Sequence, residues 1–124
     1  YKELKEDKYF IPDDWDAHWQ TKLADFVQTG NVLYHQCIAE LEPSLGRVRA
    51  KESARFFKTY NSQIQADITF NMRSFANFIS LRKSEHAQKE IRELAAEMLK
   101  LVENIEDNPF KATFDAWRVK GTIV

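Results

Sequence analysis

Hydrophobic positions recur with a helical period over most of the chain. Across residues 15–42 they return every three or four positions, which predicts one long helix. Asp13 or Asp14, just before this stretch, would serve as its N-cap. Gly30 interrupts the pattern, at a cost of about 1 kcal/mol if the helix runs through it. The Pro and Gly of residues 43–46 predict its end.

The same period predicts four shorter helices. They span residues 47–58, residues 71–82, residues 85–105, and a last segment that begins at Asn108-Pro109 and stops at Gly121. Residues 1–14 are charged, then aromatic, and then broken by a proline, which is typical of an extended arm.

One segment follows a different period. Across residues 63–70, Ile64, Ala66, Ile68 and Phe70 alternate with polar residues, which predicts a strand. A strand leaves backbone donors and acceptors that need a neighbour. Either residues 1–11 pair with it or its partners lie outside this chain. The expected class is therefore α+β and mainly helical, with about five helices and one or two strands that complete a sheet.

Composition narrows the class of protein. The 124 residues suffice for one domain, and 18 Lys and Arg against 19 Asp and Glu give a net charge of −1. This balance predicts no nucleic-acid partner. No apolar run approaches the roughly 20 residues that span a bilayer, so no membrane is expected. Cys37 is the only cysteine, which excludes an internal disulfide and fits the cytoplasm.

Conventional catalytic patterns are missing. Cys37 lies on an apolar stripe, where a cysteine is usually a small core residue. The three histidines show no metal-ligand spacing, so no metal is expected. The sequence also contains no glycine-rich phosphate loop.

Hydrogen-bond donors gather around the helix predicted over residues 71–82. They are Asn71, Arg73, Asn77, Arg82 and His86, the last of which would lie in the first helical turn that follows, where the helix dipole favours neutral imidazole. Such a set suits a planar heterocycle with carbonyl oxygens, or a phosphate. The alternative is a solvated helix face. Arg55 is likewise either an anion clamp or an ordinary surface arginine.

Three motifs together resemble one family. NMRSFANFISLRKSEHAQKEIRELAAEMLKLV looks like the C-terminal signature of flavin-dependent thymidylate synthases, N-x-R-[ST]-L-x-x-F-x-x-L-R-x-x-x-x-A-Q-x-E-I-R. Upstream, AKESARFF resembles the family's short helix with an Ala-Arg pair, and YFIP resembles its common tyrosine-aromatic-isoleucine-proline arm. The order and spacing of all three agree across nearly the whole chain.

The resemblance implies a function. Enzymes of this family convert deoxyuridine monophosphate (dUMP) to dTMP, with methylenetetrahydrofolate as carbon donor and NADPH-reduced FAD. They are homotetramers in which subunits share the flavin. By motif, Arg82 would be catalytic and would bind the uracil ring, and Arg55 would bind the dUMP phosphate. Asn71, Arg73, Asn77 and His86 would bind FAD.

This sequence also departs from the family. The hallmark R-H-R-x-x-S-x-x-x-x-x-R-Y is absent, although Tyr1 stands where its last residue would fall and would contact dUMP. Residues 1–124 are therefore expected to be the C-terminal part of one catalytic domain. Lys89 replaces a common Trp, and Lys58-Thr59 replaces a common Leu-Pro. A related pyrimidine-nucleotide hydroxymethylase and a non-enzymatic helical interaction module remain alternatives.

Overall fold

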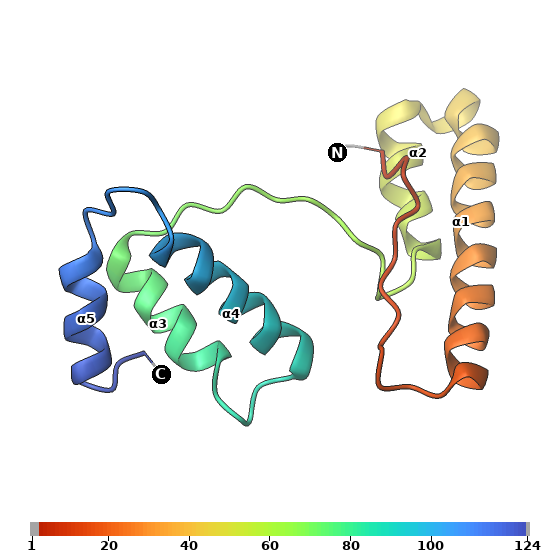
Figure 1. Ribbon diagram of the computed structural model, residues 1–124. Coiled ribbons are helices and arrows are strands. Elements are labelled where there is room, and N and C mark those ends of the chain that lie inside the picture. The colour runs from red at the N-terminus through yellow and green to blue at the C-terminus, as the bar shows by residue number, and fades with distance from the viewer. Residues whose placement is uncertain (1–2, 124) are drawn as a thin grey trace. The chain divides into compact units, whose positions relative to one another are not determined.

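The computed structural model describes residues 3–123, and the chain forms two compact units, divided in the sequence between Ala66 and Asp67 (Figure 1). Each unit is mainly helical, which confirms the helical part of the predicted class. Each is described by itself below.

The first unit is built on a long helix, α1 (Ala17–Leu45), whose N-cap is Asp16. The Asp16 carboxylate accepts a hydrogen bond of 3.0 Å from the Trp19 backbone N–H, so the predicted caps two and three residues earlier were wrong. The helix also continues through Pro43, which lies in its last turn, and ends two residues later at Leu45. It ends where Gly46 adopts a φ of +78°.

The glycine predicted to interrupt α1 has a packing role. Helix α2 (Arg47–Ala54) and a 3₁₀ turn, η1 (Arg55–Phe57), fold back against α1. A Cβ atom on Gly30 would lie 2.5 Å from the carbonyl oxygen of Phe57. Helix α1 runs straight through Gly30. Because Gly30 has no side chain, η1 can lie close to the α1 backbone.

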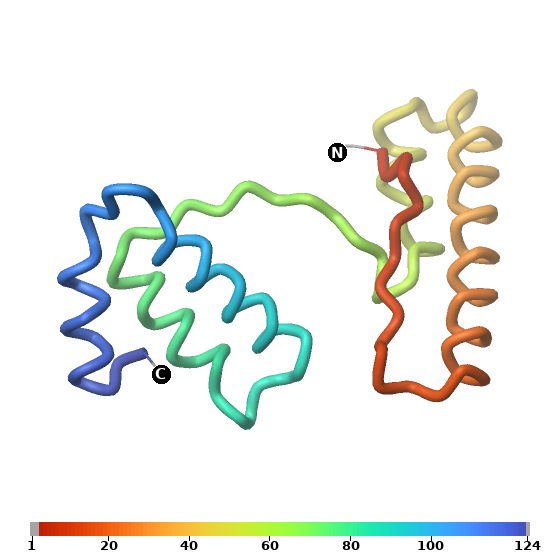
Figure 2. Tube along the Cα trace, in the orientation of Figure 1, coloured from red at the N-terminus to blue at the C-terminus, as the bar shows by residue number. Residues whose placement is uncertain are grey.

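An extended arm completes the first unit. Residues 3–11 run alongside α2 and the segment after η1 (Figure 2). An isolated antiparallel bridge joins Tyr9 to Ser62, with hydrogen bonds of 2.9 Å from Phe10 N–H to the Asn61 carbonyl and 2.8 Å from Gln63 N–H to the Lys8 carbonyl. Inside, Tyr34, Ile38 and Ala54 form a small core.

The predicted strand was wrong for the described part of the chain, where no residue belongs to a strand. Residues 63–69 are exposed, with Ile64 at 70% and Ile68 at 66%. The arm pairs only with the start of this segment, so its later backbone groups have no neighbouring strand. The alternation of apolar and polar residues is present in the sequence, but within residues 3–123 no neighbouring strand lies beside this segment and it stays extended.

The second unit contains α3 (Met72–Arg82), α4 (Lys89–Glu103) and α5 (Lys111–Val119). Its core consists of Phe75, Ile79, Ala95, Leu99, Phe114 and Ile123. Helix α3 ends at Arg82 as predicted and begins at Met72, one residue later than expected, whereas α4 begins four residues later than the expected start at Glu85. Asn108 precedes α5 by three residues and organises the turn instead, since its side chain accepts from Phe110 N–H and donates to the Val102 carbonyl.

Candidate functional site

The donor-rich residues predicted around α3 lie in the second unit and are exposed. Asn71 is the N-cap of α3, and its side-chain oxygen accepts a hydrogen bond of 2.9 Å from Ser74 N–H. Arg73 and Asn77 are four residues apart, so they share one face of the helix. Arg82 is the last residue of α3 and follows Arg73 by about two and a half turns, which places it on roughly the opposite side.

Three of these side chains have unused donors. Within residues 3–123, the side chains of Arg73, Asn77 and Arg82 make no hydrogen bond or ion pair. A guanidinium presents up to five N–H donors and an amide two. The polar edge of a flavin or a pyrimidine fits such groups, because its carbonyl oxygens and ring nitrogens would be their acceptors.

The structure corrects the placement of His86. This residue lies in a turn three residues before α4 begins, rather than in the first turn of that helix. Its backbone N–H donates to the Ser84 hydroxyl at 3.4 Å. A helix dipole acts mainly within the terminal turn, so the argument for a neutral imidazole does not apply. His86 remains exposed and can serve as a donor or acceptor.

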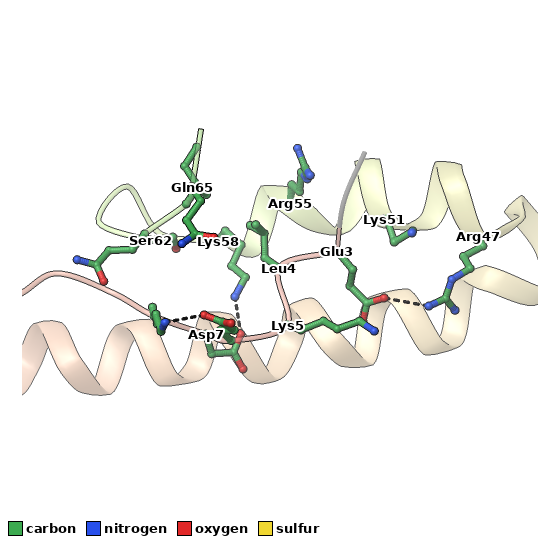
Figure 3. Close-up of a pocket in the computed structure, with 14 residues that line it drawn as sticks. Glu3, Leu4, Lys5, Asp7, Arg47, Lys51, Arg55, Lys58, Ser62 and Gln65 are labelled. Atoms are coloured by element: carbon green, nitrogen blue, oxygen red, sulfur yellow. Dashed lines mark hydrogen bonds and ion pairs between the residues drawn. The ribbon is translucent and has the colours of Figure 1, made fainter. Parts of the chain in front are cut away.

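Arg55 lies in the first unit, at the start of η1, where it lines a pocket of about 870 Å³ (Figure 3). One side of the pocket is residues 3–8 of the arm, and the other comes from α2, η1 and residues 62–65. Six basic side chains line it, against three acidic ones. The basic residues are Lys5, Lys8, Arg47, Lys51, Arg55 and Lys58. This excess of positive charge suits an anionic ligand.

A basic row on one side of α2 forms part of this pocket. Arg47, Lys51 and Arg55 follow one another at intervals of four residues, so they lie on one helical face. Arg47 is paired with Glu3 at 2.9 Å and with Glu42 at 3.0 Å. Lys51 has no ion pair in the described part of the chain, which leaves its charge available to a ligand. The spacing of this row could have identified the pocket from sequence.

A polar cluster beneath the pocket was missed by the sequence analysis. The Lys58 side chain is only 7% exposed, and its ammonium donates to Asp7 Oδ1 at 2.6 Å and to Asn31 Oδ1 at 2.7 Å. It also lies 4.6 Å from the centre of the Tyr34 ring, a cation–π distance. His35 Nε2 lies 2.9 Å from the other Asp7 oxygen. The signal available was Lys58 itself, a position where the resemblance described above implies Leu.

The Asp7 carboxyl gives the arm a pH dependence. Burial alone raises its pKa, but hydrogen bonds and positive charge from Lys58 and His35 outweigh burial and hold the pKa below its ordinary value of 3.8. A lowered pKa in the folded state means that the contribution to stability is fully present above pH 3.8 and is lost as the pH falls through the lower value.

We therefore expect Asp7→Asn to be less stable than the unmodified chain at neutral pH, with the difference shrinking below about pH 4. Denaturant titrations at several pH values would measure it. A difference between the two proteins that stays constant from pH 7 to pH 2 would contradict the assignment.

Residues 3–123 show neither a metal-binding cluster nor a membrane-spanning helix. No group of three or more His, Cys, Asp or Glu side chains is placed to hold a metal ion. None of the described helices combines the length and the apolar character needed to cross a membrane. Tyr1, predicted to contact dUMP, lies outside the described residues.

Comparisons with known proteins identify the family. The family model of the thymidylate synthase complementing protein matches residues 1–106. Flavin-dependent thymidylate synthase of Mycobacterium avium is 33% identical over 119 residues, covering 90% of this chain and 48% of that protein. The enzyme of the same name from Mycobacterium tuberculosis is 32% identical over 113 residues, covering 81% of this chain and 44% of that protein. Flavin-dependent thymidylate synthase of Geobacter sulfurreducens is 40% identical over 60 residues, covering 48% of this chain and 26% of that protein.

The chain therefore belongs to the thymidylate synthase complementing protein family. The resemblance found in the sequence is confirmed, and the relatives' name implies a flavin. The chain spans about half the length of the curated relatives in Mycobacterium that it matches.

Proposed function

We propose that this chain is the C-terminal part of a flavin-dependent thymidylate synthase. The reaction is the reductive methylation of dUMP to dTMP, with methylenetetrahydrofolate as carbon donor and NADPH as reductant of FAD. The observation that carries the proposal is the set of exposed side chains with unused donors, Arg73, Asn77 and Arg82, on the helix that bears the family signature.

The chain's own residues would bind and polarise the nucleotide. In the proposed function Arg55 holds the dUMP phosphate in the basic pocket, helped by the available charge of Lys51. Arg82 donates hydrogen bonds to the uracil carbonyl oxygens and stabilises negative charge that develops there. Tyr1 would add a contact to dUMP.

Asn71, Arg73, Asn77 and His86 would hold the flavin, which supplies the redox chemistry when it is bound. Arg73 and Arg82 lie on roughly opposite sides of α3. One ligand would therefore have difficulty reaching both from this helix alone. This separation supports a flavin site and a nucleotide site that are each completed by residues of other subunits, as in the proposed homotetramer with flavin shared between subunits. We place the protein in the cytoplasm.

The test uses the protein expressed with all the sequence that its gene encodes. We expect purified protein to show flavin absorbance near about 450 nm, to bind dUMP, and to form dTMP when methylenetetrahydrofolate and NADPH are added. Formation of a hydroxymethylated nucleotide instead would favour the hydroxymethylase. Colourless protein that binds neither added FAD nor dUMP would contradict the proposal and favour a helical interaction module.

A further inference from the structure

The pocket around Arg55 depends on the arm. Six consecutive residues of the arm, 3–8, line it, so the pocket has this shape only while the arm is docked. Contacts hold the arm along its length. Glu3 pairs with Arg47, Leu4 N–H donates to the Tyr34 hydroxyl at 3.0 Å, and Tyr9 bridges to Ser62. Asp7 lies between these contacts in the sequence, and its carboxylate contacts both Lys58 and His35.

Asp7 is held in an unfavourable backbone conformation. Its φ is +49°, in the left-handed region, which is unfavourable for residues other than glycine although Asp tolerates it better than most. Such a conformation persists only where surrounding contacts impose it. The contacts to the Asp7 carboxylate come from Lys58 and His35. The bend of the arm at Asp7 is therefore maintained by these two partners.

Lys58 also belongs to the turn that carries Arg55. Its backbone N–H donates to the Arg55 carbonyl at 3.0 Å and closes η1. The same residue thus fixes Arg55 on one side of the pocket, through its backbone, and the arm on the other, through its side chain. Figure 3 shows the Lys58 ammonium pointing toward Asp7 and the Arg55 guanidinium pointing away from it.

The Lys58 ammonium is not available to a ligand. An ammonium has three N–H donors. Two are used by Asp7 and Asn31, the Tyr34 ring lies against the group, and 7% of the side chain is exposed. Without Lys58, the Asp7 carboxylate would have only His35 as a partner, and its negative charge would oppose an anion in the pocket.

We propose that Lys58 is a positioning residue for anion binding at Arg55: it holds Asp7, and with it the arm, so that the basic pocket stays formed. The anion is taken to be the nucleotide phosphate, and to that extent the inference rests on the proposed function. Lys58 itself makes no contact with the anion.

The first experiment measures binding of inorganic phosphate, and separately of dUMP, by calorimetry. Lys58→Met keeps the apolar stem and removes the charge, and we expect it to weaken phosphate binding by about tenfold. Adding Asp7→Asn to Lys58→Met removes the stranded carboxylate but does not restore the contact that holds the arm, so the double variant should keep most of that loss. Lys100→Met is the matched control, because Lys100 is exposed, pairs with Glu97 at 3.5 Å and lies in the other unit. We expect it to change binding by less than about twofold.

A second readout separates positioning from chemistry. In active protein, Lys58→Met should raise the KM for dUMP by about tenfold while kcat changes by less than about twofold. Equal affinities for phosphate in Lys58→Met and Lys100→Met would overturn the proposal. So would a double variant that binds phosphate as tightly as the unmodified protein, because the loss in Lys58→Met would then come from the stranded charge alone. The absence of phosphate binding by the unmodified protein would overturn it as well.

A measurement on the unmodified protein covers the case in which Lys58→Met fails to fold. If phosphate requires the docked arm, phosphate must in turn stabilise that arm. Saturating phosphate should therefore slow hydrogen exchange of the backbone amides of residues 4–8. Unchanged exchange there would overturn the proposal. Phosphate binding that depends on Lys58, in a protein that binds neither flavin nor dUMP, would support this inference and contradict the proposed function.

Discussion

Arg82→Ala is expected to abolish dTMP formation while leaving the fold intact. Arg82 is exposed at the end of α3 and makes no hydrogen bond or ion pair within residues 3–123, so its removal takes nothing from the core. In the proposed function its guanidinium faces the uracil carbonyls as they gain negative charge. Loss of one such donor typically lowers kcat by about 10² to 10³. Turnover assays on the complete protein would measure the loss.

Two other variants make the Arg82 result interpretable. Arg118→Ala removes an exposed arginine of the same unit that pairs with Glu103, and it should leave turnover unchanged within about twofold. Arg82→Lys keeps the charge but loses the planar, two-pronged donor, so we expect it to recover only part of the activity. Thermal melting should be alike in all three variants. Substantial turnover by Arg82→Ala would remove this residue from the mechanism.

The helices could be predicted because their determinants are local. In α3 the apolar period is contained in about a dozen residues, and the structure confirms the predicted end at Arg82 and places the start at Met72, one residue later than predicted. The role of Asn71 as the N-cap of α3 was not predicted. The start of α4 was placed too early because Glu85 is a favourable first-turn residue, whereas the turn from Ser84 to Ala87 delays the helix to Lys89. The strand failed for the opposite reason, since its formation depends on a partner that local sequence does not contain.

The candidate site shows the same difference between features set by local sequence and features set by contacts distant in sequence. Arg55 and Arg82 were identified by motif, and their assigned roles stay predictions. The cluster beneath the pocket joins Asp7 to Lys58, 51 residues away in sequence, and to His35, 28 residues away. No periodicity links such positions. Only the folding of α2 and η1 back along α1 brings them together, and that approach depends on a glycine.

Gly30→Ala is expected to destabilise the first unit by about 2 kcal/mol. In an open helix this change would stabilise by about 1 kcal/mol, because glycine is a poor helix former. Here the new Cβ would lie 2.5 Å from the Phe57 carbonyl oxygen, and real Cβ atoms essentially never lie within 3.0 Å of another heavy atom. The obstacle is backbone, so η1 must move away from α1. Chemical denaturation would measure the loss.

The displacement of η1 should also weaken phosphate binding, because Arg55 and Phe57 belong to the same turn. Gly121→Ala is the matched control. Its φ is +67° with open space around it, so an alanine there is strained by about 1 kcal/mol without touching another segment. It should leave phosphate affinity unchanged. Gly30→Ala could instead prove more stable than the unmodified protein and bind phosphate equally well. That result would contradict the close approach of η1 to α1 and its role in forming the basic pocket around Arg55.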